Sequence, residues 1–373
     1  MDVKIVYDYQ IFSEQKYGGI SRYFHEISPR IAKMFDRDVR IVSPFYINEY
    51  FEKKSLGYSL IHGLKITQKI YNHRTDDLRD VINQKVSNFI ISGYNPDIIH
   101  ETYYTQKNIG SRKQKRVITV HDMIQEKFLS FLDPTNKLSR IKAEAISRAD
   151  HIICISESTK KDLIEILGTD EKKISTIYHG CTLNGDLSAT IRHPPEINKP
   201  YLLYVGTRSN YKNFDRLLEV YNNSQTLRRD FQLVCFGGER FSIPENRRIQ
   251  DIQLKGNVVQ ISGDDSILAH LYHRAAAFIY PSLYEGFGIP PLEAMSFGCP
   301  VVCSNVSSIP EIVGDAGEYF DPYDLDSMSH AIEKVAYSEI TASNLKRLGY
   351  ERVKLFSWDL CAEQTNKIYQ SLL

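Results

Sequence analysis

Two carboxylates stand eight positions apart in a segment rich in glycine and proline, residues 281–304. Glu285 follows an apolar run that ends at Tyr280, in a loop where parallel-sheet proteins bind ligands. Glu293 follows a proline pair in the predicted first turn of a helix, where an acid also complements the helix dipole. We expect functional roles for both acids, and Glu285 has no competing structural explanation.

Two cations stand four positions apart in an earlier strand-to-helix turn. Arg208 and Lys212 follow Gly206, which ends the apolar run 200–205. Arginine can fork across two phosphate oxygens while lysine supplies a point charge, so the pair could converge on one anion. Taken alone, the two cations would be explained by surface ion pairs with acidic side chains. The acidic loop one domain length further on favours phosphate binding.

The first half of the chain offers two weaker signals. Gly18 and Gly19 open a helical pattern, and glycine there lets a diphosphate approach backbone N–H groups. The full G-x-G-x-x-G fingerprint is missing, so the turn does not predict NAD binding. His121 ends the buried run 116–120 and could hydrogen-bond a substrate there. A histidine satisfied by backbone groups is the alternative.

These residues need a scaffold of strands and helices, and the apolar pattern predicts one. A chain of 373 residues is too long for one ordinary core, so two domains are expected. Apolar runs alternate with helical patterns in both halves, which predicts two Rossmann-like, doubly wound α/β domains. The segment 185–199 loses periodicity and is interpreted as the linker. The expected domains are residues 1–190 with a returning C-terminal helix, 358–373, and residues 199–357.

The predicted strands end at the turns described above. They are residues 3–7, 38–43, 97–100, 116–120, 151–155, 174–178, 200–205, 231–236, 258–261, 275–280 and 300–303. Helices are predicted over 78–91, 159–167, 325–336, 344–356 and 358–372, among others. Ser156 is expected to cap the helix that begins at 159. The pair Asp264–Asp265 is expected to cap a helix rather than bind a metal, because no third hard ligand lies nearby.

Composition excludes several classes of protein. Hydrophobic residues at 42% and charged residues at 25% are typical of a soluble globular protein. No apolar run is long enough to span a bilayer, and the start resembles a strand rather than a signal peptide. Six scattered cysteines indicate reduced thiols in a cytosolic protein without a zinc site. Zero net charge argues against nucleic acid as the main partner.

Charge is distributed unevenly along the chain. Residues 1–199 carry 30 basic against 25 acidic side chains, and the remainder is acidic on balance. A mildly basic first half would suit attachment to an anionic surface. The alternative is that the charge difference between the two halves is solvated and has no function.

Several motifs, in this order, resemble the retaining glycosyltransferases of family 4. They are Gly18-Gly19-Ile20, His121-Asp122, Gly206 with Arg208 and Lys212-Asn213, the segment 281–293, Gly298-Cys-Pro-Val-Val, Pro310-Glu311 and Gly314-Asp-Ala-Gly317. The second half is covered almost continuously, the first only at its ligand-facing turns. The resemblance implies the GT-B fold, two Rossmann-like domains facing across a cleft.

The resemblance also implies roles for individual residues. Arg208 and Lys212 would hold the donor diphosphate and stabilise the departing nucleotide. Glu285 would face the transferred sugar, and Glu293 would bind the ribose hydroxyls. His121 would contact the sugar. The remaining donor contacts would come from Gly18, Gly19, Gly206, Ser262, Gly286, Phe287 and Gly288.

The implied reaction is same-face transfer in which a donor phosphate oxygen takes the acceptor proton, without a metal or a resident cofactor. The subgroup resembles bacterial mannosyltransferases of surface-polysaccharide assembly, such as O-antigen and capsule. GDP-mannose is therefore the expected donor and a lipid-linked glycan the expected acceptor. The protein would be cytoplasmic, with peripheral contact at the inner leaflet. His179-Gly180 departs from the Asn-Gly of many relatives.

Three other classes remain as alternatives. A glycoside hydrolase also uses paired carboxylates, but it would leave the two cations without a phosphate. A nucleotide-sugar epimerase or hydrolase of GT-B build would turn over the donor without an acceptor. A non-catalytic nucleotide-sugar-binding subunit is disfavoured, because a retired site would tend to lose some of its residues.

Overall fold

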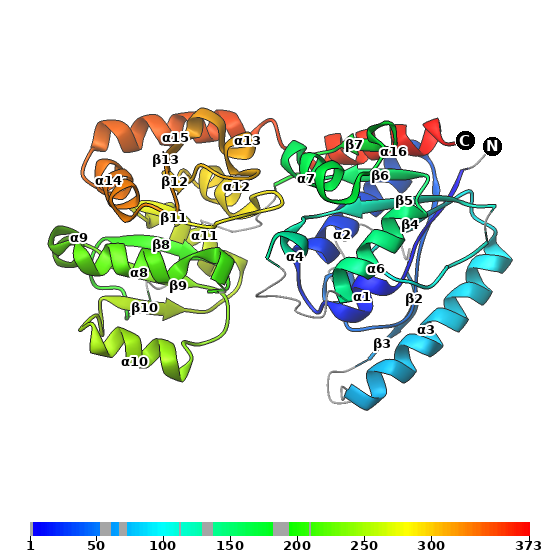
Figure 1. Cartoon of the computed structure of the whole chain (residues 1–373), viewed down its shortest axis with the longest axis horizontal. Coiled ribbons are helices and arrows are strands. Elements are labelled where there is room, and N and C mark those ends of the chain that lie inside the picture. The colour runs from blue at the N-terminus through cyan, green and yellow to red at the C-terminus, as the bar shows by residue number, and fades with distance from the viewer. Residues whose placement is uncertain are drawn as a thin grey trace. The chain divides into compact units, whose positions relative to one another are not determined.

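The chain folds into two compact units. The computed structural model describes residues 3–52, 61–66, 73–111, 113–128, 137–181, 194–208 and 210–373. Unit 1 comprises Met1–Gly180 and Ser357–Leu373, and unit 2 comprises Cys181–Phe356 (Figure 1). The expected end of the first domain, residue 190, and most of the expected linker lie outside the described residues.

Unit 1 contains a parallel sheet. Its described strands are β1 (Lys4–Tyr7), β2 (Asp38–Tyr46), β3 (Ile61–Lys65), β4 (Ile98–Glu101), β5 (Lys115–Val120), β6 (His151–Cys154) and β7 (Ile174–Thr176). They lie in the order β3-β2-β1-β4-β5-β6-β7, and each neighbouring pair is parallel. The order reverses between β1 and β4, so the loops after these two strands diverge at a topological switch point.

Helices cover both faces of this sheet, as an all-parallel sheet requires. They are α1 (Gln10–Glu14), α2 (Gly19–Phe35), α3 (His73–Tyr94), α4 (Ile124–Lys127), α6 (Lys137–Ser147), α7 (Glu157–Leu167) and α16 (Trp358–Ser371). Ile5 and Tyr7 of β1 join the apolar cluster formed with α2 and α16. Val6 between them packs with Ile91 of α3 in another cluster. This alternation is the period of two expected for a strand.

The last helix belongs to unit 1, which confirms the predicted return of the chain. α16, drawn red in Figure 1, packs along α2. The Tyr369 hydroxyl lies 3.0 Å from the Tyr7 hydroxyl and 2.6 Å from His100 Nδ1, all buried. Apolar and polar contacts together therefore fix this helix to the sheet.

Unit 2 contains a second parallel sheet. Its strands are β8 (Tyr201–Val205), β9 (Gln232–Phe236), β10 (Val258–Ile261), β11 (Ala277–Tyr280), β12 (Val301–Ser304) and β13 (Gly317–Phe320), in the order β10-β9-β8-β11-β12-β13. Its helices are α8 (Phe214–Asn223), α9 (Gln225–Asp230), α10 (Ile243–Asp251), α11 (Asp265–Arg274), α12 (Ile289–Ser296), α13 (Ile309–Val313), α14 (Leu325–Ala336) and α15 (Glu339–Val353). Here the order reverses between β8 and β11. The predicted pair of doubly wound α/β domains is confirmed.

Most predicted elements lie within a few residues of their observed bounds, and two helices begin five residues earlier than predicted. The helix predicted over 78–91 is α3, which begins at His73. The helix predicted over 344–356 is α15 and begins at Glu339, because the Ser338 hydroxyl accepts a hydrogen bond from Thr341 N and caps it. Ile340 in its first turn is 85% exposed, so no inward apolar pattern marks this start. The predicted caps Ser156 and Asp264 are confirmed.

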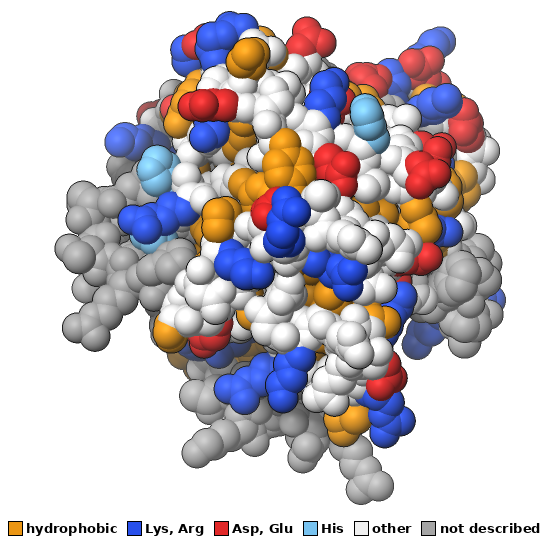
Figure 2. All heavy atoms as spheres, turned by 90° about the vertical axis from the view of Figure 1, so that its left-hand side faces the viewer, with side chains coloured by type: hydrophobic (Ala, Val, Ile, Leu, Met, Phe, Trp, Pro, Cys, Tyr) orange, Lys and Arg blue, Asp and Glu red, His pale blue; other side chains and the backbone are white. Residues whose placement is uncertain are grey.

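The surface of unit 2 has mixed charge on the side shown in Figure 2. Basic and acidic side chains are interspersed there, with hydrophobic side chains singly or in small groups between them. Such a surface is ordinary for a solvated α/β domain. None of the described helices combines the length and apolarity needed to cross a bilayer.

Candidate active site

Two loops of unit 2 meet where its sheet order reverses. The loop after β8 carries Arg208 and Lys212, and the loop after β11 carries Glu285. Leu283 N donates to Tyr211 O at 2.7 Å and ties the loops together. Ligands of open α/β sheets bind outside the carboxyl ends of strands at such a point.

Lys212 and Glu285 form an ion pair across these loops. Lys212 Nζ lies 2.6 Å from Glu285 Oε1, and the two side chains are only 17% and 10% exposed. Burial and then the Glu285 charge raise the pKa of the neighbouring Tyr280. A carboxylate this far from water depends on its cation, because an unpaired buried charge destabilises a fold by several kcal/mol.

Two serines after β12 hold the Glu285 loop in place. Glu285 N donates to Ser307 Oγ at 2.9 Å. The Ser308 hydroxyl lies 2.9 Å from Glu285 O and 2.6 Å from Phe287 O. The loop is therefore fixed by side chains, and the Glu285 carboxylate has a defined position.

Arg208 is held separately from Lys212. Its Nε donates to Glu245 Oε1 at 2.5 Å and its Nη2 to Glu239 O at 2.7 Å, and its side chain is 7% exposed. We expected both cations to converge on one anion. In the structure each cation has a different acid as partner, because Glu245 at the start of α10 lies within reach of Arg208. Glu285 and Arg208 both affect the Tyr204 hydroxyl. Burial raises the pKa of Tyr204 most, the Glu285 charge raises it further, and the Arg208 charge lowers it.

Two buried polar atoms at this edge of the sheet have no hydrogen-bond partner among the described residues. They are Arg208 Nη1 and Ser282 Oγ. A Cβ at Gly238 would lie 3.3 Å from Arg208 Nη1, so glycine leaves the guanidinium accessible from that side. A buried donor without a partner is costly, and such atoms are commonly satisfied by a ligand. Here the donor is a cation, which favours an anionic group.

Two glycines near the site have a backbone conformation that favours glycine. Gly206 has φ +133° and Gly288 has φ +129°, values that side-chain-bearing residues rarely adopt. Gly288 precedes α12, and Phe287 before it is buried against Phe356. The backbone from Gly286 to Gly288 therefore continues the loop that carries Glu285, and the Phe287 ring packs inward.

Glu293 lies in the second turn of α12, so its predicted place in the first turn is wrong. The helix begins at Ile289, one residue before the proline pair, and this shifts Glu293 away from the helix end. The helix dipole therefore explains an acid at this position less well, because its effect falls off within the first turn. The residue is 6% exposed, and its charge, after burial, raises the pKa of Tyr272.

In unit 1, His121 follows β5 and is buried in an aromatic cluster. Its ring centre lies 5.4 Å from that of Tyr23 and 5.6 Å from that of His179. Burial and the Lys142 charge lower the pKa of His121 to about 3. Its Nε2 is buried without a hydrogen-bond partner among the described residues. His121 is therefore a neutral imidazole that can donate or accept a hydrogen bond, not a cationic acid.

The turn after His121 is fixed by a buried lysine. Lys142 of α6, whose side chain is 2% exposed, donates to Asp122 O at 3.1 Å and pairs with Glu126 at 2.8 Å. The Glu126 side chain is 4% exposed. Lys142 thus positions the backbone next to His121.

The remaining predicted residues occupy the expected turns. Gly18 and Gly19 start α2, where Gln15 Oε1 accepts from Ser21 N at 3.2 Å. Ser262 follows the edge strand β10 and is exposed. The roles of Gly18, Gly19 and Ser262 as donor contacts stay predictions.

His179-Gly180 has a structural explanation. His179 stacks on Tyr23 with centroids 4.7 Å apart, and a Cβ at Gly180 would lie 2.2 Å from Trp358 N. This turn therefore accommodates the start of α16.

Comparison with known proteins agrees with this geometry. Residues 17–184 match the family described as Glycosyltransferase Family 4, and residues 189–352 match Glycosyl transferases group 1. The chain is 30% identical over 375 residues to O-antigen chain mannosyltransferase B of Escherichia coli, covering 95% of this chain and 96% of that protein. The chain belongs to glycosyltransferase family 4.

Solved structures show the same fold for this glycosyltransferase. Sucrose-phosphate synthase from Thermosynechococcus elongatus superposes with TM-score 0.77 at 20% identity, covering 100% of this chain and 99% of that one. HepE of Anabaena, in complex with UDP and glucose, gives TM-score 0.70 at 18% identity, covering 99% and 100%. The fold is GT-B.

Sequence reasoning missed several residues that position the candidate site residues within each unit of this glycosyltransferase. They are Glu245, Ser282, Ser307, Ser308 and Lys142. Ser307 and Ser308 had a usable signal, because they follow a strand adjacent to β11 and strand ends of a parallel sheet share an edge. Glu245 and Lys142 are ordinary helix residues in sequence, and only their burial or partners distinguish them. No described group of three or more His, Cys, Asp or Glu side chains could hold a metal ion.

Proposed function

We propose that this glycosyltransferase is a retaining, metal-independent mannosyltransferase that moves mannose from GDP-mannose to a lipid-linked glycan in bacterial polysaccharide assembly. Arg208 supports this most directly, because a buried guanidinium with an unsatisfied Nη1 lies at the switch point of unit 2. Two cations, Arg208 and Lys212, would offset the charge that develops on the departing diphosphate. The acids Glu285 and Glu293 would bind the sugar and the ribose.

The proposed reaction needs no protein nucleophile. The bond from the sugar C1 to the phosphate oxygen breaks while the acceptor oxygen bonds to C1 on the same face. The acceptor proton passes to a donor phosphate oxygen, and GDP leaves. Lys212 has three N–H donors, so it can remain paired with Glu285 while it donates to a phosphate oxygen. Glu285 stabilises positive charge that develops on the sugar ring.

The choice of mannose and of a glycan acceptor follows the relative named as an O-antigen chain mannosyltransferase. Peripheral membrane contact has an independent support in α3. Four apolar side chains at near-helical spacing on this helix are exposed. They are Leu78 (61%), Val81 (39%), Val86 (38%) and Phe89 (81%). An exposed apolar stripe on a helix suits shallow insertion at a lipid surface. Phe89→Ser should reduce sedimentation with anionic vesicles; unchanged sedimentation would remove this part of the proposal.

A panel of nucleotide sugars tests the donor. We expect GDP-mannose to raise the melting temperature of the full chain more than UDP-glucose, UDP-galactose or UDP-N-acetylglucosamine, because a ligand that binds only the folded state stabilises it. NMR of the transferred sugar should show retained anomeric configuration. Stabilisation by another donor alone would change the assigned sugar, and inversion would refute the same-face reaction.

The same panel separates the alternatives. An epimerase or hydrolase would convert the donor at full rate without an acceptor. A binding subunit would be stabilised by the donor and release no GDP even with membrane extracts as acceptor. The proposed transferase should release GDP slowly alone and faster with such extracts.

A further inference from the structure

Two adjacent serines of unit 2 hold the backbone of Glu285 from both sides. Ser307 Oγ accepts a hydrogen bond from Glu285 N at 2.9 Å, and the Ser308 hydroxyl lies 2.9 Å from Glu285 O. Glu285 lies between β11 and α12, so the regular hydrogen bonds of a strand or helix do not fix it. Because the residue is 8% exposed, its peptide groups need partners inside the protein. We name Ser307 and Ser308 the serine clamp.

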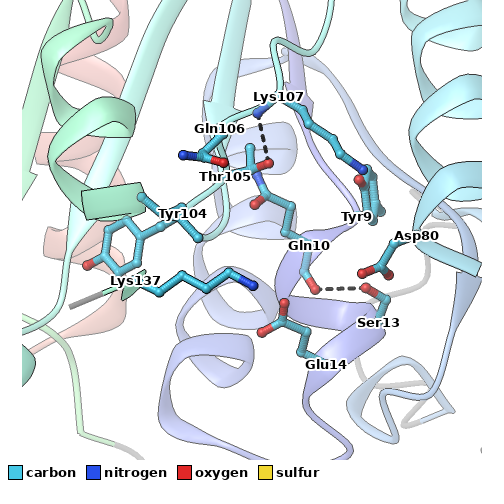
Figure 3. A pocket seen from close by; sticks show the side chains of 11 residues that line it. Tyr9, Gln10, Ser13, Glu14, Asp80, Tyr104, Thr105, Gln106, Lys107 and Lys137 are labelled. Atoms are coloured by element: carbon cyan, nitrogen blue, oxygen red, sulfur yellow. Dashed lines mark hydrogen bonds between the residues drawn. The ribbon is translucent and has the colours of Figure 1, made fainter. Parts of the chain in front are cut away.

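The serine clamp differs from ordinary contacts between hydroxyl side chains and backbone. Serine and threonine commonly bond the backbone a few residues away. In the unit 1 pocket of Figure 3, the Ser13 hydroxyl donates to Gln10 O of the same helix at 2.9 Å, and Thr105 Oγ1 accepts from Lys107 N at 3.1 Å. The serine clamp bonds backbone groups 22 and 23 positions away, in the loop of another strand. It therefore fixes a tertiary contact at Glu285 rather than a local turn.

Ser307 holds a strained backbone conformation. Its φ is +53°, in the left-handed region where residues other than glycine are uncommon. Glycine would adopt this φ without strain, but glycine has no hydroxyl for Glu285 N. Ser308 has φ −75°, so the chain returns to the right-handed region at the next residue. Successive side chains of an extended strand point to opposite sides, so this sharp turn brings both hydroxyls to one residue.

The segment that carries the serine clamp is anchored on both sides. Before it, Asn305 N donates to Phe320 O of β13 at 3.0 Å. After it, Arg352 of α15 donates from Nε to Ile312 O at 2.9 Å and from Nη2 to Glu311 O. A strained residue persists only where its surroundings fix it, and such residues cluster at functional sites. The strain at Ser307 therefore points to a function for its side chain.

We propose that Ser307 is a positioning residue for Glu285 in glycosyl transfer. Its hydroxyl acts through the Glu285 backbone and does not touch the substrate, and Ser308 holds the other side of the same residue. Catalytic geometry is sensitive to small displacements, because a shift of about 1 Å can lower a rate about 100-fold. The inference rests on the proposed function, in which Glu285 faces the transferred sugar.

Three substitutions at Ser307 separate positioning from stability. Ser307→Ala removes the hydroxyl and keeps the strain, whereas Ser307→Gly removes the hydroxyl and relieves the strain. We expect both to lower kcat about tenfold or more, measured as GDP release from GDP-mannose with membrane extracts as acceptor. Ser307→Gly should melt about 2–4 °C above Ser307→Ala. Ser307→Thr keeps a hydroxyl but places a β-branched side chain at positive φ, so it should melt below wild type and retain more activity than the other two.

Two further measurements detect a merely structural role. GDP carries no sugar, so its Kd by calorimetry should stay close to the wild-type value in all three variants while kcat falls. In a Glu285→Ala background, Ser307→Gly should cause no further loss of kcat, because a residue that acts through the Glu285 carboxylate then has nothing to position.

The matched control is Ser338→Ala. Ser338 Oγ accepts from Thr341 N at 3.2 Å in the same unit, so this variant should melt lower and leave kcat unchanged. Wild-type kcat in Ser307→Ala and Ser307→Gly, rates that follow melting temperature across the variants, or a further loss in the Glu285→Ala background would overturn the proposal. A wild-type protein that releases no GDP, or Glu285→Gln with full activity, refutes the proposed function instead, so the two failures are distinguishable.

Discussion

The Lys212 ammonium lies 2.6 Å from the Glu285 carboxylate, and the pair joins the two loops at the switch point of unit 2. Glu285→Gln keeps the size and a hydrogen-bond acceptor for Lys212 but removes the charge. We expect kcat to fall about 100-fold or more, because charge stabilisation in the transition state is lost. Stopped assays of GDP release with acceptor measure the rate, and thermal melting checks that the variant is folded.

Glu318→Gln is the matched control, since Glu318 pairs with Lys334 at 2.8 Å on the surface of the same unit. It should alter neither rate nor melting by much. Normal turnover by Glu285→Gln would remove Glu285 from the catalytic site.

Arg208→Ala should weaken binding of a nucleoside diphosphate. The guanidinium has a buried Nη1 without a described partner, and hydrogen bonds to a charged phosphate contribute about 1.5–3 kcal/mol each. The expected loss is therefore about 10- to 100-fold in Kd for GDP, measured by calorimetry. Arg248→Ala, which removes a more exposed arginine on α10, should leave Kd unchanged. Equal affinities for wild type and Arg208→Ala would contradict the assigned role.

Chelation should not inhibit transfer. Arg208 and Lys212 provide positive charge at the place where the diphosphate is proposed to bind, so no divalent cation is required to offset it. We expect equal initial rates with and without excess EDTA. Activity that disappears with EDTA and returns with manganese would refute the metal-independent mechanism.

Much of this fold could be predicted from the sequence because the buried strands are continuous apolar runs that end at marked turns. Phe278 and Ile279 show why: they face opposite sides of the sheet, yet both are fully buried. Glu285 and Lys212 could be placed at one edge of the sheet for the same reason, since parallel strands end together.

The partners within the site could not be predicted in this way. Arg208 and Glu245 are 37 positions apart, and nothing in α10 distinguishes this acid from other helix-capping acids. Lys142 shows the same limit, because a lysine in an amphipathic helix is ordinarily solvated.

Lys142→Met should destabilise unit 1. It leaves Glu126 buried without its cation, and breaking a buried pair in this way costs about 3–5 kcal/mol. Chemical denaturation measures the loss, and the double variant Lys142→Met/Glu126→Gln should recover most of it. Lys160→Met, which breaks an ion pair to the exposed Glu171, should cost less than about 1 kcal/mol. A Lys142→Met protein as stable as wild type would show that the buried pair contributes nothing.

Asp8→Asn should change how stability depends on pH. Asp8 is fully buried after β1, and burial followed by the Glu101 charge raises its pKa to about 6 from the ordinary value of 3.8. The folded state thus holds this proton more tightly than the unfolded state, so the contribution of Asp8 to stability falls as pH rises from about 4 to about 6. The asparagine amide of the variant does not titrate. Relative to wild type, Asp8→Asn should therefore gain up to about 3 kcal/mol across this interval, on top of a constant change from altered hydrogen bonds to Thr102. Urea denaturation of both proteins at several pH values measures the difference, and a difference that stays constant from about pH 4 to about pH 6 would show that Asp8 ionises normally in the fold.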